Sequence, residues 1–190
     1  MMEKTTVLRE LHNQIKNDII TNAYIHIPYQ LPPLEPTVLD LACGRGGDVH
    51  KYYHANFKRL FVIDNHRASL DVYRKRFEKS YRTVSDFKID FILHDLASDV
   101  FCMKKQVDVV VMNFALNYFF KSQRVLETLM KTVSVCLKNG GSFVGIALDG
   151  VKVREAVTNN RHNNGKIVLL NHHLHLLTIK TFIIVRLSFR

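Results

Sequence analysis

Four polar residues each end or closely follow a short apolar run, and this repeated placement is the main chemical signal in the sequence. Asp40 lies near the end of TVLDLA, Asp64 ends RLFVID, Asp95 closely follows FKIDFIL, and Asn113 follows VDVVVM. Carboxylate and amide oxygens accept hydrogen bonds from hydroxyl and amino groups. If the apolar runs are parallel strands, their carboxyl ends meet at one edge of the sheet, which is where such sheets bind ligands.

A glycine-rich loop, Cys-Gly-Arg-Gly-Gly-Asp, joins the first apolar run to a helix that opens at Asp48. Gly44 and Gly46 allow a tight turn and a close approach to a ligand. Dinucleotide-binding loops read G-x-G-x-x-G and set a helix N-terminus against a pyrophosphate. Here Asp40 and Asp48 flank the loop and would repel a phosphate. The loop therefore favours a cationic cofactor without phosphate, and S-adenosylmethionine fits this description.

The polar groups of such a cofactor can be assigned to the strand ends in order. Asp40 is the acid at the first strand tip, beside Gly44, and would face the cationic methionine end. Asp64 would accept from the two ribose hydroxyls, and Asp95 from the adenine amino group. The alternative is a structural loop with turn glycines and capping aspartates.

The pattern around these residues predicts an α/β fold. Apolar periodicity indicates helices at 7–20, 48–55, 67–79 and 122–137, the last with Gly140 just beyond its end. Short buried runs indicate strands at 37–42, 59–64, 87–93, 107–112 and 141–148. Buried strands that alternate with helices predict a doubly wound, mostly parallel sheet, the Rossmann-like class I fold of S-adenosylmethionine-dependent methyltransferases.

The sequence divides into three segments. Residues 1–36 hold a helix and a connector that carries all four prolines, and residues 37–165 form the expected methyltransferase core. Residues 166–190 alternate enough to make a pair of strands, which could belong to a truncated lobe. Three histidines in that segment, at 172, 173 and 175, are not accompanied by carboxylates, so we expect no metal site.

Composition narrows the class of protein further. The chain has 190 residues, 47% of them hydrophobic, and a net charge of +10. It lacks an apolar stretch of the roughly 18 residues that span a membrane, and its N-terminus lacks the apolar core of a signal peptide. Three cysteines without metal-site spacing favour reduced thiols in the cytosol or nucleus. The basic charge fits a nucleic-acid partner or, equally, a solvated basic surface.

These motifs resemble one family. VLDLACGRGGDVHKYY (38–53) is similar to the signature of the mRNA cap guanine-N7 methyltransferases. HNQIKNDII (12–20) resembles the N-terminal helix of that family, and FALNYFF (114–120) resembles its Phe-x-x-His-Tyr segment. LKNGGSFVGIALDG (137–150) resembles its fifth strand, with an ending closest to viral members. The resemblance covers residues 12–158 and implies methyl transfer from S-adenosylmethionine to guanine N7 of an RNA cap.

The resemblance also implies a role for individual residues. The implied cofactor-binding residues are Lys16, Asp40, Gly44, Asp64, Asp95 and Asn113. The implied cap-binding residues are His12, Asn13, Arg45, Arg76, Phe114, Asn117 and Tyr118, with Arg45 and Arg76 facing the triphosphate. No catalytic acid or base and no metal is implied. The implied partners are the GpppN end of capped RNA and another capping subunit, without a membrane, in the cytoplasm or nucleus or in a virus-infected cell.

Some positions depart from the family pattern. Asn117 stands where the family has histidine, Ala97 where it has an aromatic residue, and His12 where it has asparagine. Family members also continue well beyond the length of this chain, with a glutamate that recognises the guanine edge. Two alternatives therefore stay open: a methyltransferase of the same fold with another substrate, and a truncated, weakly active domain that binds RNA or a partner chain. A surface ion pair between Arg45 and Asp48 is the alternative to the triphosphate role of Arg45.

Overall fold

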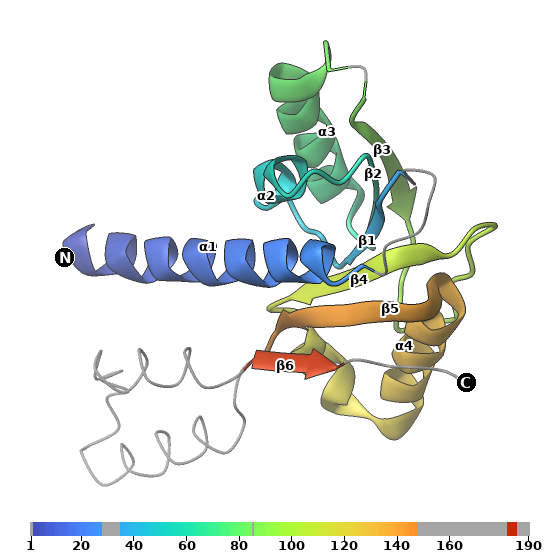
Figure 1. Ribbon diagram of the computed structural model, residues 1–190. Helices are drawn as coiled ribbons and strands as arrows, with labels where there is room; N and C mark the ends of the chain where they lie inside the picture. Colours follow the sequence, from blue (N-terminus) through green and yellow to red (C-terminus); the bar gives the residue numbers. More distant parts are fainter. Residues whose placement is uncertain (1, 28–34, 85, 148–181, 186–190) are drawn as a thin grey trace, which may run out of the picture.

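The chain folds around a six-stranded sheet (Figure 1). The structure is a computed structural model and describes residues 2–27, 35–84, 86–147 and 182–185. The elements in chain order are α1 (Met2–Ile25), β1 (Thr37–Leu41), α2 (Val49–His54), β2 (Arg59–Asp64), α3 (Arg67–Tyr81), β3 (Lys88–Leu93), β4 (Val107–Asn113), the 3-10 helix η1 (Leu116–Lys121), α4 (Gln123–Cys136), β5 (Leu137–Ile146) and β6 (Phe182–Val185).

The strand order is β3-β2-β1-β4-β5-β6. Strands β1 to β5 pair in parallel, and β6 pairs antiparallel with β5. The chain winds outward from β1 to β3, returns to β4 beside β1, and then winds outward the other way. The doubly wound prediction is confirmed, and the switch point between β1 and β4 is where this topology opens a ligand crevice.

Helices cover both faces of the sheet (Figure 1). Alternate residues of β1 point to opposite faces: Val38 joins the core beneath α1, α2 and α3, whereas Leu39 joins the core beneath α4. Asp40 has the same parity as Val38 and therefore lies on the α1–α3 side. The connection between β3 and β4 contains no helix, and Leu96 from this connection packs into the α4 core. The site is thus held between two packed layers.

Most predicted elements are confirmed within a few residues, but both ends of the first helix and the start of the fifth strand differ. The first helix begins at Met2, before the predicted residue 7. The first helix runs to Ile25, well past the predicted end at residue 20. Helix α4 ends at Cys136, and β5 begins at once with Leu137 in place of the predicted residue 141. Gly140 lies within β5 at φ +75° and does not cap the helix. The physical reason is a break in register, since Val107 pairs with Leu137 but Val109 pairs with Ser142.

Part of the predicted organisation falls outside the described residues. Of the two strands expected in 166–190, β6 is the one that the structure describes, and the three histidines lie outside the described part. Residues 28–34 of the proline-rich connector and the boundary at residue 165 also lie outside it, so the division into three segments stays a prediction. Among the described residues no helix is both long and apolar enough to cross a membrane.

Candidate functional site

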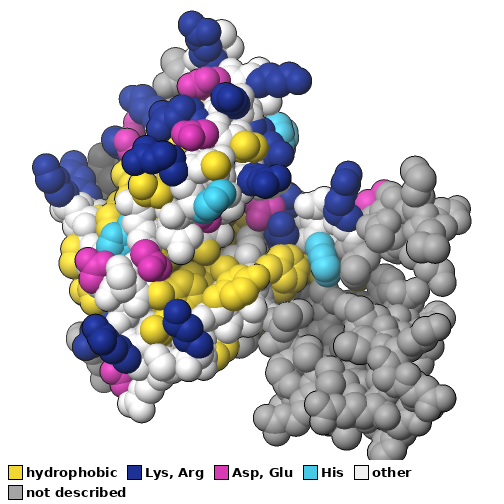
Figure 2. Space-filling model, turned by 180° about the vertical axis from the view of Figure 1, so that it is seen from behind, with side chains coloured by type: hydrophobic (Ala, Val, Ile, Leu, Met, Phe, Trp, Pro, Cys, Tyr) yellow, Lys and Arg dark blue, Asp and Glu magenta, His cyan; other side chains and the backbone are white. Residues whose placement is uncertain are grey.

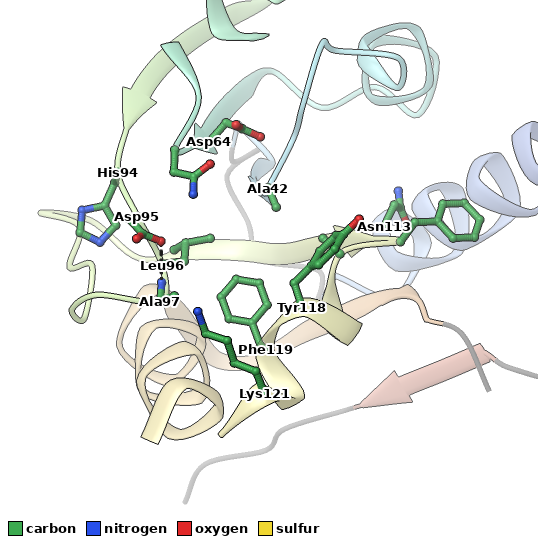
Figure 3. Close-up of a pocket in the computed structure, with 13 residues that line it drawn as sticks. Ala42, Asp64, His94, Asp95, Leu96, Ala97, Asn113, Tyr118, Phe119 and Lys121 are labelled. Carbon is green, nitrogen blue, oxygen red and sulfur yellow. Dashed lines mark hydrogen bonds between the residues drawn. The ribbon is translucent and has the colours of Figure 1, made fainter. Parts of the chain in front are cut away.

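A cavity of about 510 Å³ opens at the carboxyl ends of the first four strands. Five predicted site residues line it: Asp64, Asp95, Asn113, Phe114 and Tyr118. Figure 3 shows side chains from η1 on one side of the cavity and residues that follow β1 and β2 on the other. Residues far apart in the sequence therefore meet where the strand-end pattern predicted a ligand site.

The two acids at the open end of the cavity are held by local turns. Asp64 accepts from the backbone N–H of His66 (2.9 Å) and from that of Gly44 (2.8 Å), one through each carboxylate oxygen. Asp95 accepts from the backbone N–H of Ala97 (3.0 Å), the bond drawn in Figure 3. A carboxylate offers about four acceptor positions, so both acids keep acceptor capacity for a ligand.

The walls between these acids are apolar. Leu96 and Phe119 are largely buried cavity residues, and Ala97 is partly buried beside them. Lys121 reaches into the same space from η1 (Figure 3). A flat apolar gap beside carboxylate acceptors suits a nucleoside, whose base has two apolar faces and a polar edge.

A charged network closes the inner side of the site. The Asp48 carboxylate is 9% exposed and lies 3.0 Å from both Lys16 Nζ and Lys51 Nζ. Asn113 Nδ2 donates to the same carboxylate at 3.3 Å. The alternative of a surface ion pair between Arg45 and Asp48 is therefore wrong: Asp48 is buried and bonds to cations from α1 and α2, and Arg45 is exposed.

Asn113 keeps one polar atom free at the cavity. Its Nδ2 is committed to Asp48, and its Oδ1 is buried without a hydrogen-bond partner. A buried acceptor without a partner costs free energy unless a ligand supplies a donor. The geometry thus reserves an acceptor at the end of β4, beside the lysine-rich network.

Asp40 does not line the cavity. It is 5% exposed and lies beneath the glycine loop on the α1–α3 side. Burial, and next the negative charge of Asp48, raises the pKa of Asp40 well above its usual range. Burial also raises the pKa values of Tyr52 and Tyr73, and the charge of Asp40 raises them further. Asp40 therefore lies beneath the glycine loop and does not line the cavity, where the sequence analysis expected it to face the cationic methionine end of the cofactor.

Backbone strain gathers at the same switch point. Ala42 after β1 and Phe114 after β4 have φ values of +54° and +59°, and both line the cavity. Residues with a side chain pay about 1–2 kcal/mol for this left-handed conformation. Gly46 has φ +69°, and a Cβ there would meet the Tyr73 ring at 2.3 Å, so this position requires glycine. Strain of this kind is concentrated at functional sites.

The predicted cap residues form two groups. His12 and Lys16 of α1 lie against the Phe114 ring, with 4.8 Å between ring centroids and 5.5 Å from Lys16 Nζ to the centroid. Tyr118 is 71% exposed at the cavity mouth. Asn117, on the same short helix, has a buried Oδ1 without a hydrogen-bond partner. This first group surrounds the end of β4.

The second group lies by the glycine loop and α2. Asn13 accepts from Lys51 Nζ at 3.1 Å, which links α1 to α2. Arg76 Nη1 is 4.0 Å from the position of a Cβ on Gly47, so the guanidinium lies beside the loop. Arg45 is exposed in the loop itself, and neither arginine lines the cavity.

Sequence reasoning missed several lining residues and the role of Asp48. The missed lining residues include Ala42, His94, Leu96, Phe119 and Lys121. The 3-10 helix that supplies Phe119 and Lys121 spans six residues, too short for an apolar period to appear. A signal for Asp48 existed, because the acid ends the glycine loop, but its lysine partners lie 32 residues before it and three residues after it.

Figure 2 shows the molecule from behind the view of Figure 1. Hydrophobic side chains gather across the middle of this face, and most Lys and Arg side chains lie above them. The exposed large hydrophobic residues include Tyr118 and Phe120 of η1, at 71% and 59% exposure. The exposed apolar residues thus include Tyr118 beside the cavity, and most Lys and Arg side chains on this face lie apart from the apolar ones.

Solved structures that superpose on this chain include methyltransferases. A S-adenosylmethionine-dependent methyltransferase from Clostridium acetobutylicum superposes with a TM-score of 0.60 at 21% identity, over 73% of this chain and 52% of that one. A glycopeptide N-methyltransferase complexed with S-adenosyl-L-methionine gives a TM-score of 0.53 at 18% identity, over 70% of this chain and 57% of that one. At such identities the likeness establishes the class I methyltransferase fold.

Sequence relatives are named mRNA cap guanine-N(7) methyltransferases. The relative from Caenorhabditis briggsae is 29% identical over 157 residues, which are 80% of this chain and 41% of the relative. The Saccharomyces cerevisiae relative is 29% identical over 155 residues, 77% of this chain and 33% of the relative. The chain thus spans about two fifths of the nematode protein and about one third of the yeast protein. Both relatives are cellular proteins and give no support to a viral source.

The match to a family is more extensive than the match to any one of these relatives. The mRNA (guanine-N(7))-methyltransferase domain matches residues 2–168, which include α1, the glycine loop, all four strand ends and η1. The resemblance read from the motifs is confirmed at this level. The chain belongs to the mRNA (guanine-N(7))-methyltransferase family.

Proposed function

We propose that this chain transfers a methyl group from S-adenosylmethionine to guanine N7 of the 5′ cap of mRNA. The observation that carries the proposal is the cavity at the β1–β4 switch point, in a chain of this family. Asp64 and Asp95 offer acceptors at one end of it, and the unpaired Oδ1 of Asn113 lies at the other. The relatives bear the name of this activity.

The cavity residues fit this cofactor. Asp64 would accept from the ribose hydroxyls with its remaining lone pairs, and Asp95 from the adenine amino group. Asn113 Oδ1 would accept from the cofactor's ammonium group and so gain the donor that it lacks. Gly44, at φ +56° with open space around a Cβ position, leaves the loop backbone free for close approach.

Lys16 and Asp40 would both act on the methionine end of the cofactor. Lys16 Nζ lies at the inner end, where it would meet the cofactor's carboxylate while bonded to Asp48. Asp40 sits beneath the loop and adds negative charge close behind it. S-adenosylmethionine, when bound, supplies a methyl group on a sulfonium leaving group.

The guanine of the cap would bind at the first group of residues, around η1 and α1. Tyr118 presents an exposed ring at the cavity mouth, and stacking of a base on an aromatic ring contributes about 1–3 kcal/mol. Phe114 is already covered by His12 and Lys16, so it shapes the pocket more than it offers a free face. Asn117 Oδ1 lacks a donor and would accept from a guanine N–H.

The reaction requires orientation more than acid–base chemistry. Guanine N7 has a free lone pair, so this chain needs no residue to remove a proton. The task of Tyr118, Asn117 and the strand-end acids is to hold both substrates so that N7 faces the methyl carbon. Orientation of this kind can supply about 7–11 kcal/mol in the best cases. Arg45 and Arg76, beside the glycine loop, would bind the triphosphate through their planar guanidinium groups.

The proposal extends to the setting of the protein. Capped RNA is the expected partner, together with another capping-enzyme subunit or domain. The nucleus or cytoplasm is the expected place, since the relatives are cellular enzymes of mRNA capping.

A methyl-transfer assay with GpppA tests the proposal. We expect S-adenosylmethionine-dependent formation of m7GpppA, identified by chromatography against N7- and 2′-O-methylated standards. Thermal shift with the cofactor and with the cap dinucleotide runs in parallel. A shift from the cofactor alone favours another substrate, and the absence of a cofactor shift favours the binding-domain alternative. Methylation at any atom other than N7 contradicts the proposal.

A further inference from the structure

Helix α3 carries two exposed flanks of different charge. Lys79 lies three residues after Arg76 and four after Lys75, so its side chain neighbours both of them on one flank. None of the three has an ion pair among the described residues. This set is called the basic stripe below.

The opposite flank of the same helix is electrically mixed. Arg67, Asp71, Arg74 and Glu78 follow one another at spacings of four, three and four residues, so cations and acids alternate along it. Arg74 also lies 4.4 Å from the centroid of the Phe91 ring of β3. Lys75 lies four residues after Asp71 and three before Glu78, whereas Arg76 and Lys79 have no acid three or four residues away on α3, so the positive charge of α3 is unbalanced around Arg76 and Lys79.

The basic stripe adjoins the glycine loop. Arg76 lies beside Gly47, and it also acts on His50 of α2. Partial burial lowers the pKa of His50, and the positive charges of His54 and Arg76 lower it further. Lys79 follows Arg76 by one helical turn and carries the positive charge away from the loop.

Several cations elsewhere on the surface are paired. Lys58 lies 2.8 Å from Asp86, Arg59 lies 2.8 Å from Asp90, and Lys138 bonds to Asp108 at 2.7 Å. Pairs of this kind neutralise a surface for an incoming polyanion. The stripe on α3 therefore combines unpaired charge with contact to the loop, where the triphosphate is proposed to bind.

We infer that the basic stripe binds the phosphate backbone of the RNA that follows the cap. This inference rests on the proposed function, because it continues the path of the substrate from Arg45 and Arg76 onto α3. His50 and His54 are exposed on α2, one turn apart, and the charge of Arg76 acts on His50, whose ring also packs against Tyr81 of α3 with 5.4 Å between centroids. Proteins that bind single strands without sequence preference combine cations along the backbone with rings on which bases stack.

The prediction concerns the length of the RNA. A cap dinucleotide ends at the nucleoside after the triphosphate and has no further phosphates to place on Lys75 or Lys79, whereas a capped 15-mer has them. The double variant K75Q/K79Q should bind the dinucleotide like wild type and the capped 15-mer about five- to tenfold more weakly. Each phosphate contact to a single strand contributes about 0.7 to the salt slope, so the slope should fall by about 1.4.

The experiment measures affinity by fluorescence anisotropy between about 50 and 200 mM salt. The matched control is K104Q/K105Q, which removes two exposed, unpaired lysines from the connection between β3 and β4. We expect the control to retain the wild-type salt slope. Circular dichroism melting checks that both variants fold, and the single variants K75Q and K79Q replace the double one if it does not.

The outcomes separate this inference from the proposed function. Wild-type methylation of GpppA is assayed in the same preparation. Absence of N7 methylation contradicts the proposed function whatever the stripe does. Normal methylation with equal RNA affinity in K75Q/K79Q and the control overturns the stripe, as does an equal loss for the dinucleotide and the 15-mer. Equal RNA affinity in K75Q/K79Q and the control would make an acidic protein surface the next partner to test.

Discussion

The site has two parts that are built in different ways: the charged network beside Asn113, called the inner end, and the acids of the cavity, called the outer end. At the inner end, Lys16, Asp48, Lys51 and Asn113 satisfy one another across α1, α2 and β4, with Lys16 and Asn113 separated from Asp48 by 32 and 65 residues. At the outer end, Asp95 bonds to a backbone N–H only two residues away, and Asp64 does so in part. The inner end therefore depends on the whole fold, whereas the outer end depends largely on local turns.

This difference separates stability from ligand binding. A buried ion pair that loses one partner leaves a charge without solvent, which destabilises the folded protein strongly. When an exposed acid in a turn loses its charge, water solvates the group, and the folded protein loses little stability. Substitutions at the inner end should therefore unfold the chain before they report on the cofactor, and substitutions at the outer end should do the reverse.

The largest effect is expected from Asp48→Ala. It removes the carboxylate that Lys16 and Lys51 share and leaves both mostly buried ammonium groups unpaired. We expect a loss of about 3–5 kcal/mol in unfolding free energy, measured by urea denaturation. Asp48→Asn keeps an acceptor for Asn113 and should lose less. If Asp48→Ala unfolds at the wild-type urea concentration, the network does not hold the inner end together.

Asp95→Asn tests the outer end. Asparagine keeps the oxygen that accepts from the Ala97 N–H but loses the charge available to the adenine amino group. A hydrogen bond to a charged group contributes about 1.5–3 kcal/mol, so cofactor affinity should fall about 10- to 100-fold. Stability should stay within about 0.5 kcal/mol of wild type. Calorimetric titration with S-adenosylmethionine measures the first, and melting measures the second.

Asp99→Asn is the matched control for that variant. Asp99 is exposed, lies four residues further on and faces His94, but it does not line the cavity. Its loss should leave cofactor affinity unchanged. Equal weakening by both variants would mean that net charge, not a bond to adenine, explains the effect of Asp95.

The same contrast explains what could be predicted from the sequence. Asp64 and Asp95 stand at the ends of apolar runs, and a strand that ends in an acid shows itself locally. The glycine loop was visible for the same reason, because Gly44 and Gly46 adopt positive φ in a short segment. The sheet followed from the alternation of buried runs with helices.

The inner end could not be predicted in this way. The bond between Asp48 and Asn113 joins residues on α2 and β4 that only the strand order brings together. The burial of Asp40 depends on Tyr52 and Tyr73, which come from two different helices over the loop. The length of β5 was also hidden, because its break in register depends on pairing with β4.

Asp40→Asn sharpens the comparison through pH. The folded protein raises the pKa of Asp40, so folding favours the protonated acid. The contribution of Asp40 to stability is therefore fully present below its unfolded pKa of about 3.9 and is lost as pH rises through the folded pKa. Asparagine does not titrate, so Asp40→Asn should be more stable than wild type at pH 8.

Melting temperatures of both proteins across a pH series measure this effect. The advantage of Asp40→Asn should shrink steadily as the pH is lowered, because the wild-type acid then gains its proton. Cofactor affinity at pH 8 is measured alongside, and we expect it to fall because negative charge behind the loop is lost. A constant difference in melting temperature at every pH would show that ionisation of Asp40 does not destabilise the folded protein.

The smallest effect is expected from Ala42→Gly, at the junction of the two ends. Ala42 lines the cavity with φ +54°, a conformation that costs a residue with a Cβ about 1–2 kcal/mol. Glycine removes this strain but adds about 0.4–1 kcal/mol of chain entropy in the unfolded state. The net gain should therefore be about 1 kcal/mol or less, seen as a rise of roughly 2–4 °C per kcal/mol in melting temperature.

Ala55→Gly provides the reference for that small gain. Ala55 caps α2 with φ −73° and is 6% exposed, so glycine relieves no strain there and only adds unfolded-state entropy. The two variants should move the melting temperature in opposite directions. A fall in both would mean that the Ala42 methyl group packs in the loop strongly enough to outweigh its backbone strain. The junction would then resemble the inner end, where contacts formed by the whole fold decide the outcome.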